Sequence, residues 1–193
     1  MSAAPPGPKP ENGPPAGGVD AGYDRGMRLL EGGDFLAALP LLRTVMEAVP
    51  GNEQIVRTLL RLGRGAAQAA LALPVQTPEA AELYECSLAG YLATGSTISG
   101  KADCDLLRAV CFNLGAYYHG RALYPQAIRH YQDALLLNPD HDDAPNNLAQ
   151  VLIEDGQPLE ALAMLTAAMQ RHPKSAVLQH RKEQALKAAG RPQ

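Results

Sequence analysis

Apolar side chains in the second half of the chain recur at the spacing of helices. Leu114 and Tyr118 are four residues apart, and so are Ala127 and Tyr131. Residues four apart lie on the same face of a helix, so each of these two segments predicts a short helix with one apolar stripe. Only a short connection separates the two segments, and the pattern therefore predicts a helical pair.

The same pattern occurs a second time, 34 residues later and without a gap. Residues 108–141 read RAVCFNLGAYYHGRALYPQAIRHYQDALLLNPDH, and residues 142–175 read DDAPNNLAQVLIEDGQPLEALAMLTAAMQRHPKS. The matching positions are Leu114 and Leu148, Gly115 and Ala149, Tyr118 and Leu152, Ala127 and Ala161, Tyr131 and Leu165, Ala134 and Ala168, and Pro139 and Pro173. Recurrence at a fixed period of this length is typical of repeat proteins.

The small and rigid residues of the repeat have mechanical roles. Gly115 and Ala127 are small where two helices must approach closely. Pro139 and Pro173 end the second helix of each repeat, because the residue before a proline disfavours helical backbone. One helical pair cannot bury its apolar stripes alone, so neighbouring pairs are expected to stack.

This pattern of small, large and proline positions resembles the tetratricopeptide repeat (TPR). The bulky residue that the family carries near the start of each repeat is replaced here by Cys111 and Pro145. The resemblance implies an all-α fold in which helical hairpins stack into a solenoid, a right-handed superhelix. The residues expected to be buried are Leu114, Tyr118, Ala127, Tyr131, Leu148, Leu152, Ala161 and Leu165.

A third, less regular copy covers residues 19–52. Its matching positions are Gly26 and Leu29 in the first helix, the GGDF turn, Ala38 and Leu42 in the second helix, and Pro50 at the end. Arg25 stands where the family has Leu, and Val45 where it has Ala. Residues 176–189 are expected to form a C-terminal capping helix, so that residues 19–189 make a single solenoid domain.

Between residues 53 and 107 the period fails, although helical spacing continues. Residues 53–73 are rich in Ala and Leu, and Thr77 followed by Pro78 is a typical start of a helix. We therefore expect an irregular helical insertion. Residues 1–18 are rich in Pro and Gly and hold no large apolar side chain, so they predict a disordered tail.

The stretch GSTISGKA, from Gly95 to Ala102, has the skeleton of a phosphate-binding P-loop, with Gly95, Gly100 and Lys101 at its defining positions. A P-loop joins a strand to a helix, and a Ser or Thr after the Lys holds Mg²⁺. Here Ala102 follows Lys101, and a predicted helix precedes Gly95. We interpret the stretch as a connection between helices and expect no nucleotide to bind.

Composition narrows the function further. The formal net charge is −3, and nothing in the charge balance indicates general nucleic-acid binding. No stretch is apolar enough for a signal peptide or a membrane span, so we expect a cytoplasmic protein without membrane insertion. Cys86, Cys104 and Cys111 are odd in number and lack CxxC spacing, which argues against a disulfide framework or a metal site.

Motifs of catalysis are missing from the sequence. The five histidines show no HExxH or HxH spacing, and no Ser or Cys lies in a nucleophile motif. We therefore expect no enzymatic activity and no cofactor. From Arg171 onward basic residues outnumber acidic ones, which fits either a solvated capping helix or a basic end that meets an acidic partner.

Two functions agree with the TPR resemblance. The first is an adaptor or scaffold that binds a peptide segment of a partner protein in the concave groove. The alternative is a TPR-type chaperone or assembly factor that escorts a secreted or complex-forming substrate. Helical spacing places the expected groove residues at Phe112, Asn113, His119, Asn146, Asn147, Gln150 and Arg181.

Asn113 and Asn147 are one period apart, and Arg181 occupies the next step. This resembles the asparagine ladder in the TPR arrays of O-GlcNAc transferases, which implies that side-chain amides hold a peptide backbone irrespective of its sequence. The alternative is that both asparagines only cap or solvate their helices. Phe112, Ala116 and Val177 stand where the carboxylate clamp of chaperone-tail TPR domains needs Lys, Asn and Lys. Recognition of a free C-terminal carboxylate is therefore not expected.

Overall fold

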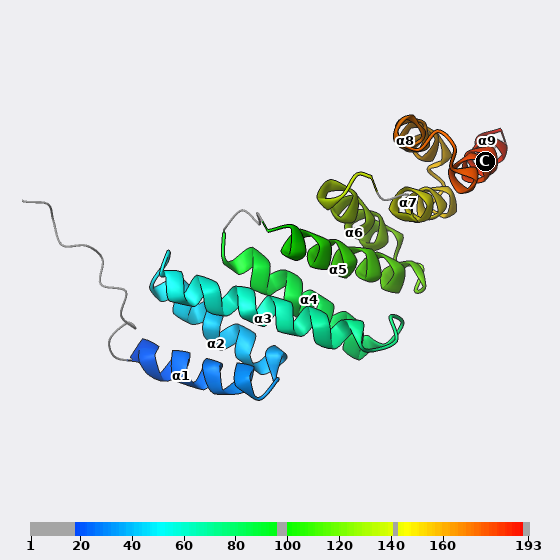
Figure 1. The fold of residues 1–193 in the computed structure, drawn as a ribbon. Helices are drawn as coiled ribbons and strands as arrows, with labels where there is room; N and C mark the ends of the chain where they lie inside the picture. The colour runs from blue at the N-terminus through cyan, green and yellow to red at the C-terminus, as the bar shows by residue number, and fades with distance from the viewer. Residues whose placement is uncertain (1–17, 96–99, 141–142, 191–193) are drawn as a thin grey trace, which may run out of the picture.

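Helical hairpins follow one another along an elongated array (Figure 1). The computed structural model describes residues 18–95, 100–140 and 143–190. These residues form nine helices and no strand: α1 (Gly18–Glu31), α2 (Phe35–Ala48), α3 (Glu53–Leu71), α4 (Pro78–Ala93), α5 (Lys101–His119), α6 (Tyr124–Leu137), α7 (Asp143–Glu154), α8 (Pro158–Arg171) and α9 (Ala176–Ala189). The all-α hairpin array predicted from the sequence is confirmed for this part of the chain. The tail predicted over residues 1–18 lies almost wholly outside it.

Side-chain caps and prolines determine where several helices begin. Asp34 accepts a hydrogen bond from the Ala37 N–H at the start of α2. The same kind of cap is formed at α3, α4 and α9 by Asn52, Thr77 and Ser175. Prolines occupy the first turn of α4, α6 and α8, where a missing N–H removes no helical hydrogen bond.

Three hairpins close with the same tight turn. The backbone N–H of Asp34 bonds to the carbonyl five residues earlier, and Leu123 and Gln157 do the same in the α5–α6 and α7–α8 turns. One residue in each turn has a left-handed backbone: Gly33 (φ 80°), Ala122 (φ 55°) and Gly156 (φ 79°). Glycine adopts this conformation without strain. The α5–α6 turn differs from the other two because alanine, Ala122, occupies this position.

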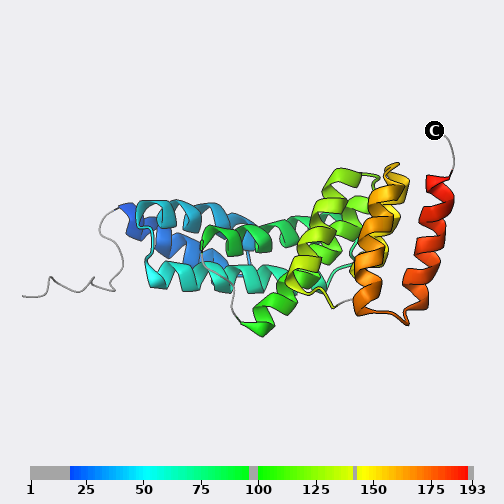
Figure 2. The ribbon, with the colours of Figure 1, turned by 90° about the horizontal axis from the view of Figure 1, so that it is seen from above.

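Each hairpin packs on the next, and the core runs along the whole array. α2 contacts α3 and α4, α4 contacts α5, α6 contacts α7, and α9 packs against both α7 and α8. Two perpendicular views show the hairpins in chain order from α1 to α9 (Figures 1 and 2). Tyr84, Leu114, Tyr131 and Leu165 are among the large side chains that solvent does not reach.

Seven of the eight residues predicted to be buried are buried. Tyr118 is the exception, and that prediction was wrong: its side chain is only half-buried. The Tyr118 hydroxyl donates a hydrogen bond to the Glu85 carboxylate at the surface, and its ring stacks on the His130 ring with centroids 5.4 Å apart. The polar tip therefore stays at the edge of the core.

Helix α1 buries a different stripe from the one that the repeat alignment places there. Tyr23, Gly26 and Leu30 are buried, whereas Arg25 is exposed and Leu29 is half-buried. Around Gly26, the large buried residues thus lie one position later than in the aligned repeats. This offset explains why Arg25 stands where the family has Leu.

The irregular segment forms a helical hairpin of its own. α3 and α4 pack along each other; α4 is longer than α2 and α6, and α3 is longer than α1 and as long as α5. Helix α5 begins at Lys101, seven residues before the repeat boundary suggested by the alignment at residue 108. No described helix combines the length and the apolar character needed to cross a lipid bilayer.

Candidate functional site

The odd-numbered helices α1, α3, α5, α7 and α9 lie side by side, and we call them the first-helix row. On α1 and α3, the Tyr23 and Thr58 hydroxyls are 3.1 Å apart. Between α3 and α5, Arg64 donates two hydrogen bonds to Asp103, with N–O distances of 2.6 and 2.7 Å. α7 packs on both α5 and α9. The row therefore presents one continuous face that crosses all the hairpins.

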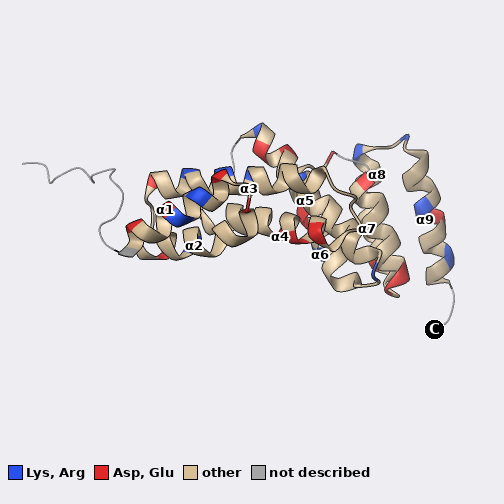
Figure 3. Cartoon of the chain, turned by 90° about the horizontal axis from the view of Figure 1, so that it is seen from below, with Lys and Arg blue, Asp and Glu red and all other residues tan. Residues whose placement is uncertain are grey.

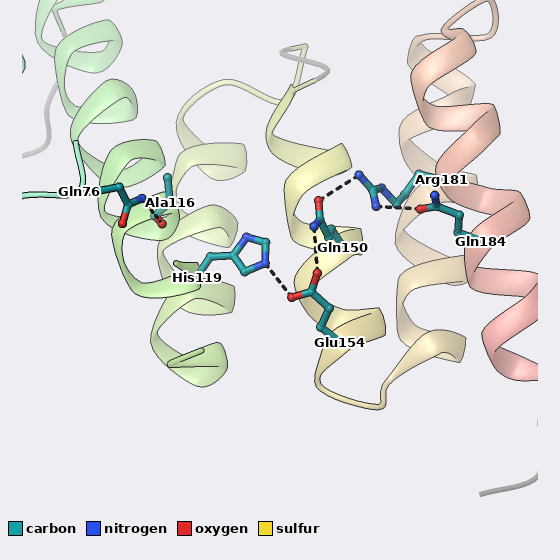
Figure 4. Close-up of polar contacts among 7 residues, drawn as sticks. All are labelled: Gln76, Ala116, His119, Gln150, Glu154, Arg181 and Gln184. Carbon is teal, nitrogen blue, oxygen red and sulfur yellow. Dashed lines mark hydrogen bonds and ion pairs between the residues drawn. The ribbon is translucent and has the colours of Figure 1, made fainter. Parts of the chain in front are cut away.

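A line of hydrogen-bonded side chains crosses the last three helices of this row, and we call it the polar strip (Figure 4). It consists of His119 on α5, Gln150 and Glu154 on α7, and Arg181 and Gln184 on α9. His119 Nε2 lies 2.9 Å from Glu154 Oε2, and Gln150 donates from Nε2 to Glu154 Oε1 at 2.9 Å. Arg181 donates from Nη2 to Gln150 Oε1 at 3.0 Å and from Nη1 to Gln184 Oε1 at 2.8 Å. Arg181 also donates from Nε to Asn146 Oδ1, and Asn146 donates to Asn147 Oδ1. Five of the seven predicted groove residues thus lie in one region with Glu154 and Gln184: His119, Asn146, Asn147, Gln150 and Arg181.

The two charged side chains of the strip, Glu154 and Arg181, are hydrogen-bonded to their neighbours. Burial opposes ionisation of Glu154, but hydrogen bonds from Gln150 and His119 outweigh it, and the pKa of this carboxyl lies below its ordinary value. Burial lowers the pKa of Arg181, while the charge of Glu154 raises it. The lowered pKa of Glu154 favours its ionised form at neutral pH, and an arginine side chain keeps its positive charge in proteins.

Asn113 and Asn147, the two steps of the predicted ladder, both contact a tyrosine of the preceding hairpin. Asn113 donates from Nδ2 to the Tyr84 hydroxyl at 2.8 Å, and the Asn147 side chain hydrogen-bonds the Tyr131 hydroxyl. Both tyrosine side chains are buried, and burial raises the pKa of Tyr131 to about 12. Each amide therefore links two hairpins as well as lying near the groove.

Sequence reasoning missed these tyrosine–asparagine pairs. Tyr131 precedes Asn147 by 16 residues (147 − 131), whereas Tyr84 precedes Asn113 by 29 (113 − 84). The longer first part of α5 adds most of the difference, and the longer α4 and its connection to α5 add the rest, so no fixed spacing marks the pairs. The recurrence of a tyrosine before each asparagine was the only available signal.

Next to the strip, the α5 surface is partly apolar. Phe112 is half-buried and meets the Tyr131 ring edge-on, with centroids 5.6 Å apart. The carbonyl of Ala116, one turn later, accepts a hydrogen bond from Gln76 Nε2 at 2.9 Å (Figure 4). Arg121 adds hydrogen bonds to the same glutamine, so the α3–α4 connection is fastened to the end of α5.

The stretch with a P-loop skeleton lies between two helices. α4 ends at Ala93 and α5 begins at Lys101, while residues 96–99 fall outside the described residues. No strand precedes Gly95 in the described chain, so the strand that a P-loop requires is not there. The Lys101 side chain is exposed on the first turn of α5.

The three thiols do not form a reactive or metal-binding group. Burial raises the pKa of Cys86 to about 11 and that of Cys111 to about 12, with the charge of Asp133 adding to the second shift. Cys86, Cys104 and Cys111 form no disulfide, and Cys104 is half-exposed. Within the described residues, no group of three or more His, Cys, Asp or Glu side chains is arranged to hold a metal ion.

Comparison with known proteins finds a family similarity over part of the chain. Residues 123–180, which span α6, α7, α8 and the start of α9, match the tetratricopeptide repeat profile. Over these residues the chain is similar to the tetratricopeptide repeat family, and the helical hairpins described above are the arrangement that such repeats form. The TPR fold in general supports protein–protein interaction, and its members are generally non-enzymatic scaffolds. A search of curated proteins finds no match to the sequence.

Solved structures with a similar helical arrangement share little sequence with this chain. MamA of AMB-1 is 20% identical over 90% of this chain and 83% of its own, with a TM-score of 0.47. Cut9 in the APC/C hetero-tetramer Cut9–Hcn1 is 21% identical over 87% and 30%, with a TM-score of 0.48. A putative kinesin light chain with TPR-like repeats from Podospora anserina is 19% identical over 89% and 87%, also with a TM-score of 0.48. None of these similarities identifies the partner of this protein.

Proposed function

We propose that the protein is an adaptor or scaffold that binds a peptide segment of a partner protein across α5, α7 and α9. The polar strip carries this proposal. It joins side chains from three successive first-row helices into one hydrogen-bonded line, and its members are only partly buried. A solvent-facing line of donors and acceptors that crosses several repeats matches the course of an extended polypeptide.

The strip is suited to a backbone rather than to one side chain. Gln150 and Gln184 of the strip, and Asn146 beside it, present amides, which pair with peptide N–H and C=O groups whatever the bound sequence. Because the side chains already hold one another in place, little rotamer freedom is lost when a ligand binds. Phe112 and Ala116 add apolar surface beside the strip for one side chain of the segment.

Asn113 and Asn147 belong to the proposed site, although each also contacts a tyrosine of the preceding hairpin. An Asn amide has two N–H donors and an acceptor oxygen. Tyr84 takes one donor of Asn113. The remaining donor and the oxygen suit a bound backbone, so a ladder function and the tyrosine contact are compatible.

A second candidate function is that of a chaperone or assembly factor, and an apolar groove on the second helices favours it. The groove lies between α6 and α8 and has a volume of about 550 Å³. Its lining includes Leu135, Leu136, Leu148, Met164 and Pro139. Leu136, at the edge of the groove, is 83% exposed. A client protein that is unfolded, or that has not yet met its own partner, would cover this surface.

The test of the first proposal is affinity purification from the native host with the intact protein as bait, followed by mass spectrometry. The captured partner is then titrated against the wild type and against the double variant Asn146→Ala, Gln150→Ala. Each lost amide should cost about 1 kcal/mol of binding, so the affinity should fall roughly ten- to thirtyfold. The matched control is Gln126→Ala, Gln170→Ala, which removes two exposed amides from α6 and α8.

Unchanged affinity for the strip variant would place the interface elsewhere and reject the proposal. A partner that stays insoluble unless it is co-expressed with this protein, and that loses this protection when Leu136 is changed to Asp, would support the chaperone function instead.

A further inference from the structure

The apolar groove between α6 and α8 lies apart from the polar strip, since no residue of the strip lines it. Pro145 and Leu148 of α7 are the buried part of its lining on that helix, and most of the remaining lining comes from α6 and α8. The strongly exposed Leu136 stands at its edge. Apolar side chains gathered at the surface in this way are typical of an interface with another protein.

Helix α8 has charged side chains only near its two ends, Glu160 in the first turn and Arg171 in the last, with uncharged residues between them (Figure 3). Four residues of this helix line the groove at intervals of four, three and four positions: Glu160, Met164, Ala167 and Arg171. This is the spacing of the a and d positions of a coiled coil, so the four side chains form one stripe along the helix. We call it the α8 stripe.

The charged ends of the α8 stripe face solvent. Glu160 and Arg171 are both exposed, and among the described residues neither enters an ion pair. The stripe thus presents an acid at one end, a base at the other and an uncharged centre, all beside the apolar groove. A partner that covers it has to match these three parts in order.

The α8 stripe is complementary to itself when a second copy is turned end over end. Glu160 lies as far before the midpoint of the stripe as Arg171 lies after it, and Met164 and Ala167 are equally far from the same midpoint. In a dimer with a twofold axis, residue i contacts residue j and j contacts i. Two antiparallel α8 helices therefore bring Glu160 of each copy to Arg171 of the other, and Met164 of each to Ala167 of the other. Such a contact combines two ion pairs with the packing of a large side chain against a small one.

This charge pattern favours a second copy of the chain over an unfolded client as the occupant of the groove. A client offers apolar side chains, but it has no fixed pair of opposite charges separated by about three helical turns. A second copy carries both charges in the required order, with uncharged residues between them.

We propose that two copies of the protein form a dimer in which α8 of each copy lies antiparallel in the α6–α8 groove of the other. This arrangement covers Leu136 and pairs both charged ends of the α8 stripe. It does not depend on the peptide-binding function proposed above, and it uses no residue of the polar strip. Each dimer accordingly carries two strips, and a partner with two suitable segments binds both more tightly than it binds one.

The first measurement is sedimentation equilibrium of the intact protein over a wide range of concentrations, in which the wild type should approach the mass of a dimer. Glu160→Arg places two basic residues opposite each other at both ends of the antiparallel pair, and Arg171→Glu places two acidic residues there. An exposed ion pair contributes only modestly, but each variant loses two of them and gains two repulsions. Either variant should therefore raise the dissociation constant of the dimer roughly tenfold or more.

Mixing the two single variants in equal amounts tests the pairing itself. In a mixed dimer one copy carries two basic residues at the ends of the stripe and the other carries two acidic ones, so opposite charges meet at both contacts. The mixture should dimerise about as well as the wild type, and so should the double variant Glu160→Arg, Arg171→Glu. Glu183→Arg and Lys187→Glu on α9 are the matched controls, because they reverse charges at exposed positions outside the groove lining and should leave the dimer unchanged.

Each other outcome would overturn the inference. A wild type that stays monomeric up to its highest soluble concentration contradicts the dimer. A dimer that both charge reversals leave intact is formed by another surface. A mixture that fails to dimerise, although each reversal weakens the dimer, rejects the antiparallel pairing of α8. A monomeric wild type that keeps an unfolded client in solution, and loses this ability on Leu136→Asp, assigns the groove to the client instead.

Discussion

The hydrogen bond from Asn113 to Tyr84 joins two hairpins through a hydroxyl that solvent does not reach. Removing only the donor leaves this hydroxyl buried without its partner, and an unsatisfied buried polar group costs more than the hydrogen bond contributes on balance. Asn113→Ala should therefore lower the free energy of unfolding by about 1–3 kcal/mol. Urea denaturation followed by circular dichroism measures this change.

The control for this prediction is Tyr84→Phe, which removes the hydroxyl together with its need for a partner. In the Tyr84→Phe background, Asn113→Ala should cost clearly less than in the wild type, because nothing is left unsatisfied. An equal cost in both backgrounds would show that the pair contributes nothing to stability.

At the level of residues, the sequence predicted burial better than it predicted polar contacts. Burial follows from helical spacing, which is a local property, and it failed only at Tyr118, where a surface carboxylate on another helix holds the hydroxyl. The partners of Asn113 and Asn147 lie on other hairpins and at different distances along the chain. Such contacts depend on how the hairpins pack, so the sequence could predict that these residues lie on first helices of the repeats but could not predict their internal contacts.

Helix packing within the third hairpin leaves no room above Gly115. A Cβ built at this position on α5 would lie 2.7 Å from two ring carbons of Tyr131 on α6. Tyr131 is buried and has no space to move aside. Gly115→Ala should therefore destabilise the protein by about 1–3 kcal/mol, although alanine has the higher helix propensity.

Gly22 on α1 provides the matched control. A Cβ there would meet the Val45 side chain at 3.5 Å, an ordinary van der Waals contact. Gly22→Ala should raise the stability by up to about 1 kcal/mol through helix propensity alone. Thermal unfolding of the two variants should give shifts of opposite sign, and a stabilised Gly115→Ala would mean that α5 and α6 are packed less closely than described.

The 34-residue period predicted helices and turns well, but it could not place every helix end. α5 begins at Lys101 because Asp103, in its first turn, is held by Arg64 of α3 and by the Tyr91 hydroxyl of α4. Arg64, Tyr91 and Asp103 all lie outside residues 108–175, so the alignment of those residues contained no sign of the cluster. The shifted stripe of α1 has a similar cause, since the Tyr23 hydroxyl contacts Thr58 of the next hairpin.

On the scale of the whole molecule, the Arg64–Asp103 pair ties the first two hairpins to the remainder of the array. Hydrogen bonds from Arg64 lower the pKa of Asp103, with a further contribution from Tyr91. Because the folded-state pKa is depressed, the stabilisation is complete above the unfolded value of about 3.9 and is lost as the pH falls through the lower folded value.

Asp103→Asn should therefore lower the free energy of unfolding at pH 7 by about 1 kcal/mol, a modest figure because the Arg64 side chain is 50% exposed and solvent screens the pair. The difference between variant and wild type should shrink below about pH 4. Urea unfolding at pH 7, 4 and 3 measures it. A difference that persists unchanged at pH 3 would show that ionisation of Asp103 is not its source.

The polar strip also has a direction. Glu154 can only accept hydrogen bonds when ionised and Arg181 can only donate them, so the Gln150 amide between them is held with its NH₂ toward one and its oxygen toward the other. A polypeptide laid along the strip presents its N–H and C=O groups in opposite order when it is reversed. If a polypeptide binds there as proposed, an amide that cannot turn over distinguishes N-to-C from C-to-N, and the charged side chains on its two sides, Glu154 and Arg181, favour one polarity of the bound chain.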